Sequence, residues 1–266
     1  MLSFTILGSG SSGNCTVVST DEATILIDAG LSAKQITLRL EAAGFNPGAL
    51  DGILLTHEHG DHTAGLEIFS KKWNVPIYAT PLTRETIEHN FRHAPRWKLM
   101  QTGSPFHVKD IRIECFSVPH DAVDPVGFIL QDMESKLGFL SDVGFVTNLI
   151  RERLQGAHTL FLEANYDTDL LEADTKRPWP TKQRISSRHG HLSNAQAAEL
   201  VTAVAHEALH QVVLGHLSED CNHPDTAAGF IRNALIECSF HDVEVWCADR
   251  KCASPRREVA RRVAVM

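Results

Sequence analysis

The hexapeptide HEHGDH at residues 57–62 places four side chains that can bind a metal ion within six positions. His57 and His59 are two residues apart, so an extended turn projects both imidazoles to the same side. Imidazole and carboxylate ligands suit Zn²⁺, and equally Mn²⁺ or Fe. A lone histidine is more often an ordinary surface or core residue, but the pattern H-x-H-x-D-H indicates a metal site.

Ligand-type side chains also follow three apolar segments further along the chain. They are His120, Asp142 and His216. Strands aim side chains rigidly, and the loops at strand ends leave room for a substrate. We therefore expect these three residues to join the cluster at 57–62.

The elements that must position these residues alternate between strands and helices. Strands are expected at 3–7, 15–19, 24–28, 52–56, 76–79, 111–118, 126–130, 137–141, 159–163, 210–214 and 243–246. Helices are expected at 32–43, 63–73, 81–91, 147–154, 194–208 and 224–238, and an irregular region at about 173–190. Two groups of strands, each followed by helices, predict a single α/β domain built as a four-layer αββα sandwich. We place this domain at residues 1–253 and a peripheral basic C-terminal tail at 254–266.

The composition is that of an ordinary globular protein, with 43% apolar and 22% charged residues and a net charge of −8. Its longest apolar runs are far too short to cross a bilayer. The N-terminus resembles a strand more than a signal peptide. Six cysteines without a C-x-x-C pair favour a reduced, cytoplasmic chain.

One stretch is positively charged although the chain as a whole is acidic. Residues 176–194 carry five cationic side chains and no anionic one. These cations are Lys176, Arg177, Lys182, Arg184 and Arg188, which we call the cationic strip. A phosphodiester needs cations and backbone donors along its length. Ser193 or Asn194 is expected to cap the next helix, and a capped helix N-terminus beside a glycine suits a phosphate. The strip favours a nucleic-acid substrate, although a solvated surface loop would have the same composition.

Two further residues admit two interpretations each. Trp179, between Pro178 and Pro180, can stack on a base or can close the loop as a hydrophobic plug. Asn14, in the glycine-rich turn at 8–14, can reach a substrate or can serve the turn alone.

The order and spacing of seven residues resemble the ligand set of the metallo-β-lactamase-fold superfamily. The seven are His57, His59, Asp61, His62, His120, Asp142 and His216. The resemblance implies that the histidines at 57, 59 and 120 hold one metal ion. It implies that the residues at 61, 62 and 216 hold a second, and that the aspartate at 142 bridges both. Redox members of the superfamily have a glutamate where this chain has His59, so the resemblance implies a hydrolase. Two divalent ions, Zn²⁺ or Mn²⁺ with Fe as a third candidate, would then share an activated hydroxide.

Other motifs are similar to those of the YycJ (WalJ) group, small bacterial exonucleases that act on DNA from the 5′ end and are linked to mismatch repair. These motifs lie at residues 8–14, 28–32, 119–122, 163–165, 178–194 and 217–222. The segment Gly190–Ser193 is also similar to the phosphate-binding Gly-His-Ala-Ser of RNase J-type nucleases. By that analogy His191 contacts the scissile phosphate or protonates the leaving oxygen, and Ser193 helps to hold the phosphate.

The predicted function is a metal-dependent phosphodiester hydrolase, namely a 5′ to 3′ DNA exonuclease of DNA repair, with DNA favoured over RNA and no membrane partner. The catalytic candidates are Asp61 and His191. The substrate-binding candidates are Asn14, Lys182, Arg184, Arg188, His191 and Ser193. Two alternatives stay open: a phosphodiesterase for small cyclic or nucleotide esters, and a catalytically silent metal-binding protein. A thioesterase would leave the cationic strip without a purpose.

Overall fold

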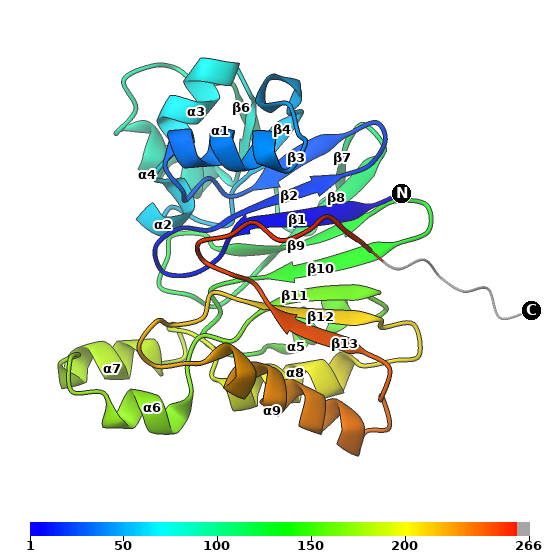
Figure 1. The fold of residues 1–266 in the computed structure, drawn as a ribbon. Helices are drawn as coiled ribbons and strands as arrows, with labels where there is room; N and C mark the ends of the chain where they lie inside the picture. Colours follow the sequence, from blue (N-terminus) through cyan, green and yellow to red (C-terminus); the bar gives the residue numbers. More distant parts are fainter. Residues whose placement is uncertain (260–266) are drawn as a thin grey trace, which may run out of the picture.

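The computed structural model describes residues 1–259. Two seven-stranded sheets lie face to face, and helices cover the outer face of each sheet (Figure 1). This arrangement confirms the predicted four-layer α/β sandwich in a single domain.

The strands of the first sheet come mainly from the N-terminal part of the chain. They are β1 (Ser3–Gly8), β2 (Cys15–Ser19), β3 (Thr24–Ile27), β4 (Gly52–Leu54), β5 (Ile77–Ala79), β6 (Trp97–Leu99) and β14 (Arg257–Glu258). Their order is β14-β1-β2-β3-β4-β5-β6. Strands β3 to β6 run parallel to one another, whereas β1 and β2 pair antiparallel with their neighbours.

The second sheet repeats this mixture with the order β13-β12-β11-β10-β9-β8-β7. Its strands are β7 (Phe106–Val108), β8 (Ile111–Ser117), β9 (Val126–Gln131), β10 (Lys136–Leu140), β11 (Thr159–Glu163), β12 (Gln211–Gly215) and β13 (Glu244–Cys247). Strands β10 to β13 are parallel. Each sheet therefore has a parallel half whose carboxyl ends lie along one edge.

The helices are short, and each except α7 has buried residues. They are α1 (Ala33–Ala42), α2 (Gly60–Thr63), α3 (Leu66–Trp73), α4 (Pro81–Glu88), α5 (Asn148–Leu154), α6 (Thr168–Ala173), α7 (Trp179–Ile185), α8 (Asn194–Val204) and α9 (Pro224–Glu237), with a 3₁₀ turn at Pro47–Ala49. Helices α1, α3 and α4 lie over the first sheet, and α5, α8 and α9 lie over the second (Figure 1). Within residues 1–259, no helix is both long and apolar enough to cross a membrane.

Three apolar layers hold the four layers of structure together. One fills the space between the sheets, where the rings of Phe139 and Phe161 stack with their centroids 4.3 Å apart. The second lies between the first sheet and α1 and α3, and the third lies between the second sheet and α5, α8 and α9. Central strands are buried on both faces, which explains why they read as continuous apolar runs in the sequence.

Three residues that follow parallel strands have left-handed backbone conformations. They are Asp28 (φ 62°) after β3, Asp142 (φ 56°) after β10 and His216 (φ 53°) after β12. Such a conformation costs a non-glycine residue about 1–3 kcal/mol. Each turns the chain sharply at a strand end, and all three side chains belong to the site described below.

Several segments differ from the sequence prediction. Strands β6 and β7 and helix α6 form where no element was expected. The helix expected at 63–73 is divided into α2 and α3, and Gly65 between them packs so closely that a Cβ atom there would lie 2.2 Å from the carbonyl oxygen of Leu31. The region expected to be irregular at 173–190 contains α7. The prolines there indicated a loop, but Pro178 is the N-cap of α7 and Pro180 lies in its first turn, where proline is tolerated.

The C-terminal segment is also more ordered than a peripheral tail. β14 pairs antiparallel with β1, and Val259 is fully buried between the sheets. Residues 254–259 are therefore part of the fold. The remainder of the predicted tail, 260–266, lies outside the described residues.

We expect Gly30→Ala to destabilise the protein by about 2 kcal/mol or more, because a Cβ atom at this position would lie 1.6 Å from the carbonyl oxygen of Asp61. The matched control is Gly229→Ala in α9, where nothing lies within 4 Å of the added carbon. That change should raise stability by about 0.5–1 kcal/mol. Urea unfolding of both variants measures the difference, and equal midpoints for Gly30→Ala and the wild type would contradict the packing described.

Candidate metal centre

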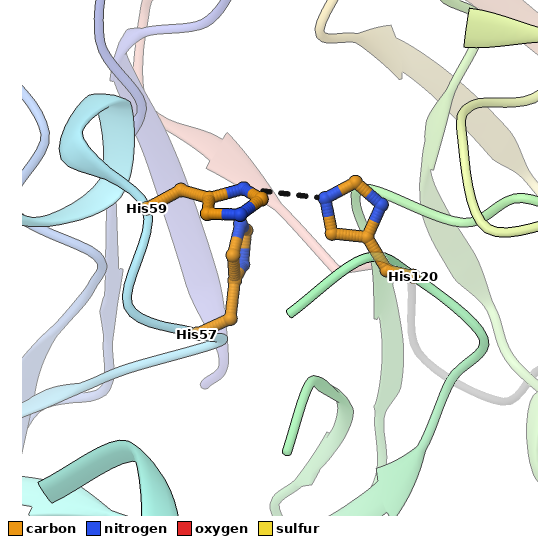
Figure 2. Close-up of side chains that lie close together, drawn as sticks. All are labelled: His57, His59 and His120. Carbon is orange, nitrogen blue, oxygen red and sulfur yellow. Dashed lines mark hydrogen bonds between the residues drawn. The ribbon is translucent and has the colours of Figure 1, made fainter. Parts of the chain in front are cut away.

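Three histidines from the two sheets meet at the edge where the parallel strands end. His57 and His59 lie in the loop after β4, and His120 faces them from the loop after β8 (Figure 2). One ring nitrogen from each lies within 4.8 Å of the others. Nε2 of His120 is 3.4 Å from Nδ1 of His59. The structure thus brings the first predicted trio together.

The hydrogen bonds around His57 fix which of its ring nitrogens carries the proton. The Thr56 hydroxyl donates its only hydrogen to the carboxylate of Asp28, at 2.9 Å, so it accepts from Nδ1 of His57 at 3.0 Å. Nε2 of His57 is therefore unprotonated and has a free lone pair. It is buried and has no hydrogen-bond partner. Burial, followed by the neighbouring His62, holds the pKa of His57 well below its ordinary value. A neutral imidazole with an unpartnered buried nitrogen is what a metal ion requires.

His120 is oriented in the same manner from the other side of the site. Its Nδ1–H donates to the carbonyl oxygen of Gly190 at 2.9 Å, which turns Nε2 toward His59. Burial lowers the pKa of His120. Backbone carbonyls commonly fix metal-binding histidines in this way. The loop that carries Gly190 therefore sets the direction of a histidine 70 residues earlier in the chain.

A second trio lies beside the first. Oδ2 of Asp61 is 3.4 Å from Nε2 of both His62 and His216. The amide of Asn14 donates to the same Oδ2 atom at 3.3 Å. The side-chain oxygen of Asn14 accepts from the backbone of Gly10. The glycine-rich turn at 8–14 thereby holds Asp61 in place.

Asp142 lies between the two trios. Its Oδ2 is 3.1 Å from Nε2 of His62, its Oδ1 is 3.0 Å from Nδ1 of His216, and Oδ1 is 3.9 Å from Nε2 of His120. Burial would raise the pKa of Asp142, but His216 and His62 outweigh it and hold this pKa well below the ordinary value. A buried, deprotonated carboxylate thus faces both trios.

The same charges act on the histidines of the second trio. Burial alone would lower the pKa of His62, yet Asp142 and Asp28 raise it well above its usual range. Burial also opposes the shift of His216, whose pKa Asp142 raises. Both rings therefore carry protons that a bound cation would displace. The donor set of the two trios fits divalent cations: imidazole nitrogens and deprotonated carboxylates around buried positions.

Two carboxylates that support the site were not assigned from the sequence. Asp28 is buried, accepts from Nδ1 of His62 at 2.7 Å, and orients that ring. Glu163 is also buried, and its Oε1 accepts from Nδ1 of His191 at 2.6 Å and of His216 at 3.1 Å. Its Oε2 accepts backbone N–H groups of Val143 and Leu192. Each follows or ends a parallel strand, the signal that identified Asp142 and His216.

His191 lies at the open side of the centre. Its side chain is 21% exposed, and Glu163 orients it through Nδ1. Burial would lower the pKa of His191, but the carboxylate of Glu163 outweighs this and raises it. The raised pKa favours the charged imidazole, which can donate the proton on Nε2.

The predicted substrate contacts divide into buried and exposed groups. Asn14 and Ser193 are buried, and both have protein partners: Asn14 holds Asp61, and the Ser193 hydroxyl caps α8 by accepting from the Gln196 N–H at 3.2 Å. This confirms Ser193 as the helix cap. Contacts of either residue with a substrate stay a prediction.

The cations of the strip do not form one free positive track. Lys176 and Arg177 pair with Asp220, and Arg177 also pairs with Asp174. Arg184 pairs with Asp121, beside His120, while its side chain stays 66% exposed. Two cations have uncharged partners: Lys182 donates to the Glu172 carbonyl at 2.8 Å, and the guanidinium of Arg188 lies 4.2 Å above the Phe145 ring.

Two facing mixed sheets with histidine and aspartate clusters at their strand ends define a metallo-β-lactamase-fold hydrolase. Residues 23–217 match the model of the β-lactamase superfamily domain, and the chain belongs to that superfamily. The crystal structure of the metallo-β-lactamase fold protein YhfI from Bacillus subtilis has the same fold. It matches with a TM-score of 0.73 and 16% identity, over 96% of this chain and 99% of that one.

Two curated relatives are similar over nearly the whole chain. Exodeoxyribonuclease YycJ of Bacillus anthracis is 34% identical over 241 residues, which cover 90% of this chain and 91% of the relative. Exodeoxyribonuclease WalJ of Streptococcus pneumoniae is 32% identical over 263 residues, which cover 96% and 97%. These findings confirm the resemblance seen in the sequence.

We expect Glu163→Gln to lower the free energy of unfolding by about 2 kcal/mol, because an amide cannot accept from all four donors around this buried position. Urea denaturation measures the change. Glu237→Gln, on the exposed end of α9, is the control and should shift stability by less than about 0.5 kcal/mol. Equal stability of the wild type and Glu163→Gln would mean that this carboxylate does not hold the site together.

Proposed function

We propose that this chain is a metal-dependent phosphodiester hydrolase that degrades DNA from the 5′ end in the cytoplasm, as an exonuclease of DNA repair. The observation that carries the proposal is the convergence of two trios of ligand-type atoms on Asp142, with His191 at the opening. The names of the two relatives that match over most of the chain support DNA as the substrate.

The seven predicted ligands would hold two divalent cations, Zn²⁺ or Mn²⁺ with Fe as a third candidate. His57, His59 and His120 would hold one ion, and Asp61, His62 and His216 the other, with Asp142 between them. Bound in this way, divalent cations supply Lewis-acid stabilisation of a phosphoryl group and lower the pKa of a water molecule that attacks it.

Two side chains of the protein would move or orient protons during hydrolysis. Asp61 is partly exposed, and burial, which would raise its pKa, is outweighed by His216 and His62, so the carboxylate stays deprotonated. It can orient the attacking water by accepting a hydrogen bond. His191 can donate its Nε2 proton to the leaving oxygen while its Nδ1–H stays hydrogen-bonded to the Glu163 carboxylate.

Hydrolysis of an anionic polymer also needs cations outside the centre. Arg184 is joined to the loop of His120 through Asp121, and Lys182 and Arg188 have partners that bear no charge. These three cations would bind phosphates of the strand that leads to His191. The remaining cations of the strip brace their own loop through Asp174 and Asp220.

We expect His59→Ala to reduce hydrolysis of a 5′-phosphorylated DNA duplex at least 100-fold and to lower the metal content by about one ion per chain, because one trio loses a ligand. Metal analysis and end-labelled product ladders measure both quantities. His191→Ala should lower the rate while keeping the metal content, since it removes a proton donor. His241→Ala, an exposed histidine beyond α9, is the control.

The same assay separates the alternative functions. Single- and double-stranded DNA and RNA are compared with bis(p-nitrophenyl) phosphate, with added Mn²⁺ or Zn²⁺. Ladders that shorten from the 5′ end of DNA support the proposal. Turnover of the small ester alone would favour a small-ester phosphodiesterase, and full metal content without turnover of any substrate would indicate a silent binding protein.

We expect Arg184→Gln to weaken duplex binding severalfold at low salt, with a loss that shrinks as salt increases, because one phosphate contact is removed. The control is Lys109→Gln. Lys109 pairs with Asp51, the residue before β4, and so lies at the edge of the sheets opposite the metal centre. Fluorescence anisotropy at several salt concentrations gives both affinities. If Arg184→Gln binds as tightly as the wild type, the strand follows another route to the centre.

A further inference from the structure

The indole of Trp179 is unusually exposed for a tryptophan on a well-anchored backbone. It is the first residue of α7, and 66% of its surface is accessible. The exposure excludes the hydrophobic plug considered from the sequence. Pro178 and Pro180 restrict the backbone on either side. The preceding loop is anchored where Arg177 pairs with Asp174 at 2.8 Å and with Asp220 at 3.0 Å.

The other three tryptophans are packed against the protein. The indole nitrogens of Trp73, Trp97 and Trp246 are all buried. A lysine covers the ring of Trp73, and Phe91 packs against Trp97 with ring centroids 5.9 Å apart. Trp179 is therefore the most exposed of the four tryptophans, since the other three are partly buried.

Helix α7 connects this ring to the metal centre. Its last residue, Ile185, accepts the backbone N–H of His191 at 2.8 Å. Gly190 packs so tightly on this helix end that a Cβ atom there would lie 2.1 Å from the Ile185 carbonyl oxygen. The far end of α7 is therefore fixed at the proposed proton donor. Ile185 lies six positions after Trp179, which is about 9 Å along the helix axis.

A nucleic-acid strand can span this length in a few nucleotides. Successive phosphates of each strand of a duplex rise ~3.4 Å along the axis, and an unpaired strand can extend further per step. Lys182 and Arg184 lie between the two ends of this path, and both belong to α7. A strand with its reactive phosphate at His191 would thus pass cations before it reaches the indole.

We propose that Trp179 is a stacking platform for an unpaired base a few nucleotides from the phosphate that is cut. The proposal rests on the nuclease function proposed above and adds to it the recognition of a single-stranded end. Every base has an aromatic face, so such a platform binds strands without regard to sequence. The cations of α7 supply the complementary charge for the phosphates on either side of that base.

The test uses the full-length, metal-loaded protein with a phosphorothioate-linked oligothymidylate, which resists cleavage, and an abasic strand of equal length and charge. Oligothymidylate should quench the tryptophan emission of the wild type, and Trp179→Ala should bind it about tenfold more weakly. Trp179→Phe should restore most of the affinity. Phe230→Ala, an exposed aromatic residue of α9, should bind like the wild type.

The abasic strand separates stacking from charge, because the wild type and Trp179→Ala should bind it equally. The platform is refuted if oligothymidylate does not quench the emission of the wild type and Trp179→Ala binds it as tightly as the wild type does. If the wild type still degrades DNA in that case, the nuclease proposal stands without the platform. If the wild type neither binds nor degrades any strand, both proposals fail.

Discussion

Three carboxylates are buried where the two sheets meet, and each must be matched by partners because an unpaired buried charge is very costly. Asp28, Asp142 and Glu163 all have less than 3% of their surface exposed. Asp28 is matched by His62 and Thr56, Asp142 by His62 and His216, and Glu163 by two histidines and two backbone N–H groups. His62 follows β4 of the first sheet and pairs with Asp142, which follows β10 of the second, so the charge balance of Asp142 is complete only when the two sheets are correctly docked.

The two sides of the centre differ in the protonation of their histidines. Around His57 and His120, hydrogen bonds to Thr56 and Gly190 leave neutral nitrogens that face one another. Around His62 and His216, carboxylates keep the imidazoles charged in the absence of a cation. One side is thus prepared to coordinate directly, whereas the other must exchange protons for a metal. Under the proposal that each side holds one cation, the order in which the two cations bind would depend on pH.

The sequence was sufficient to predict the layers of the fold and the seven ligand-type residues, because both are local patterns: apolar strands, and polar residues where those strands end. It was not sufficient for the supporting carboxylates. The role of Glu163 depends on which histidines the fold brings within hydrogen-bonding distance of it, and these are distant in sequence. The pairing of Arg184 with Asp121 spans 63 residues, and no local pattern indicates it. Helix α7 was missed because its prolines are compatible with either a loop or a helix start.

The first and last described strands are partners, since β14 completes the first sheet by pairing with β1. During synthesis, β1 emerges from the ribosome some 250 residues before the strand that covers its edge. An uncovered edge is a template for pairing with other chains. The nascent protein therefore has an unpaired strand edge until β14 has been synthesised, so arrest or truncation before residue 257 should favour aggregation over simple loss of stability.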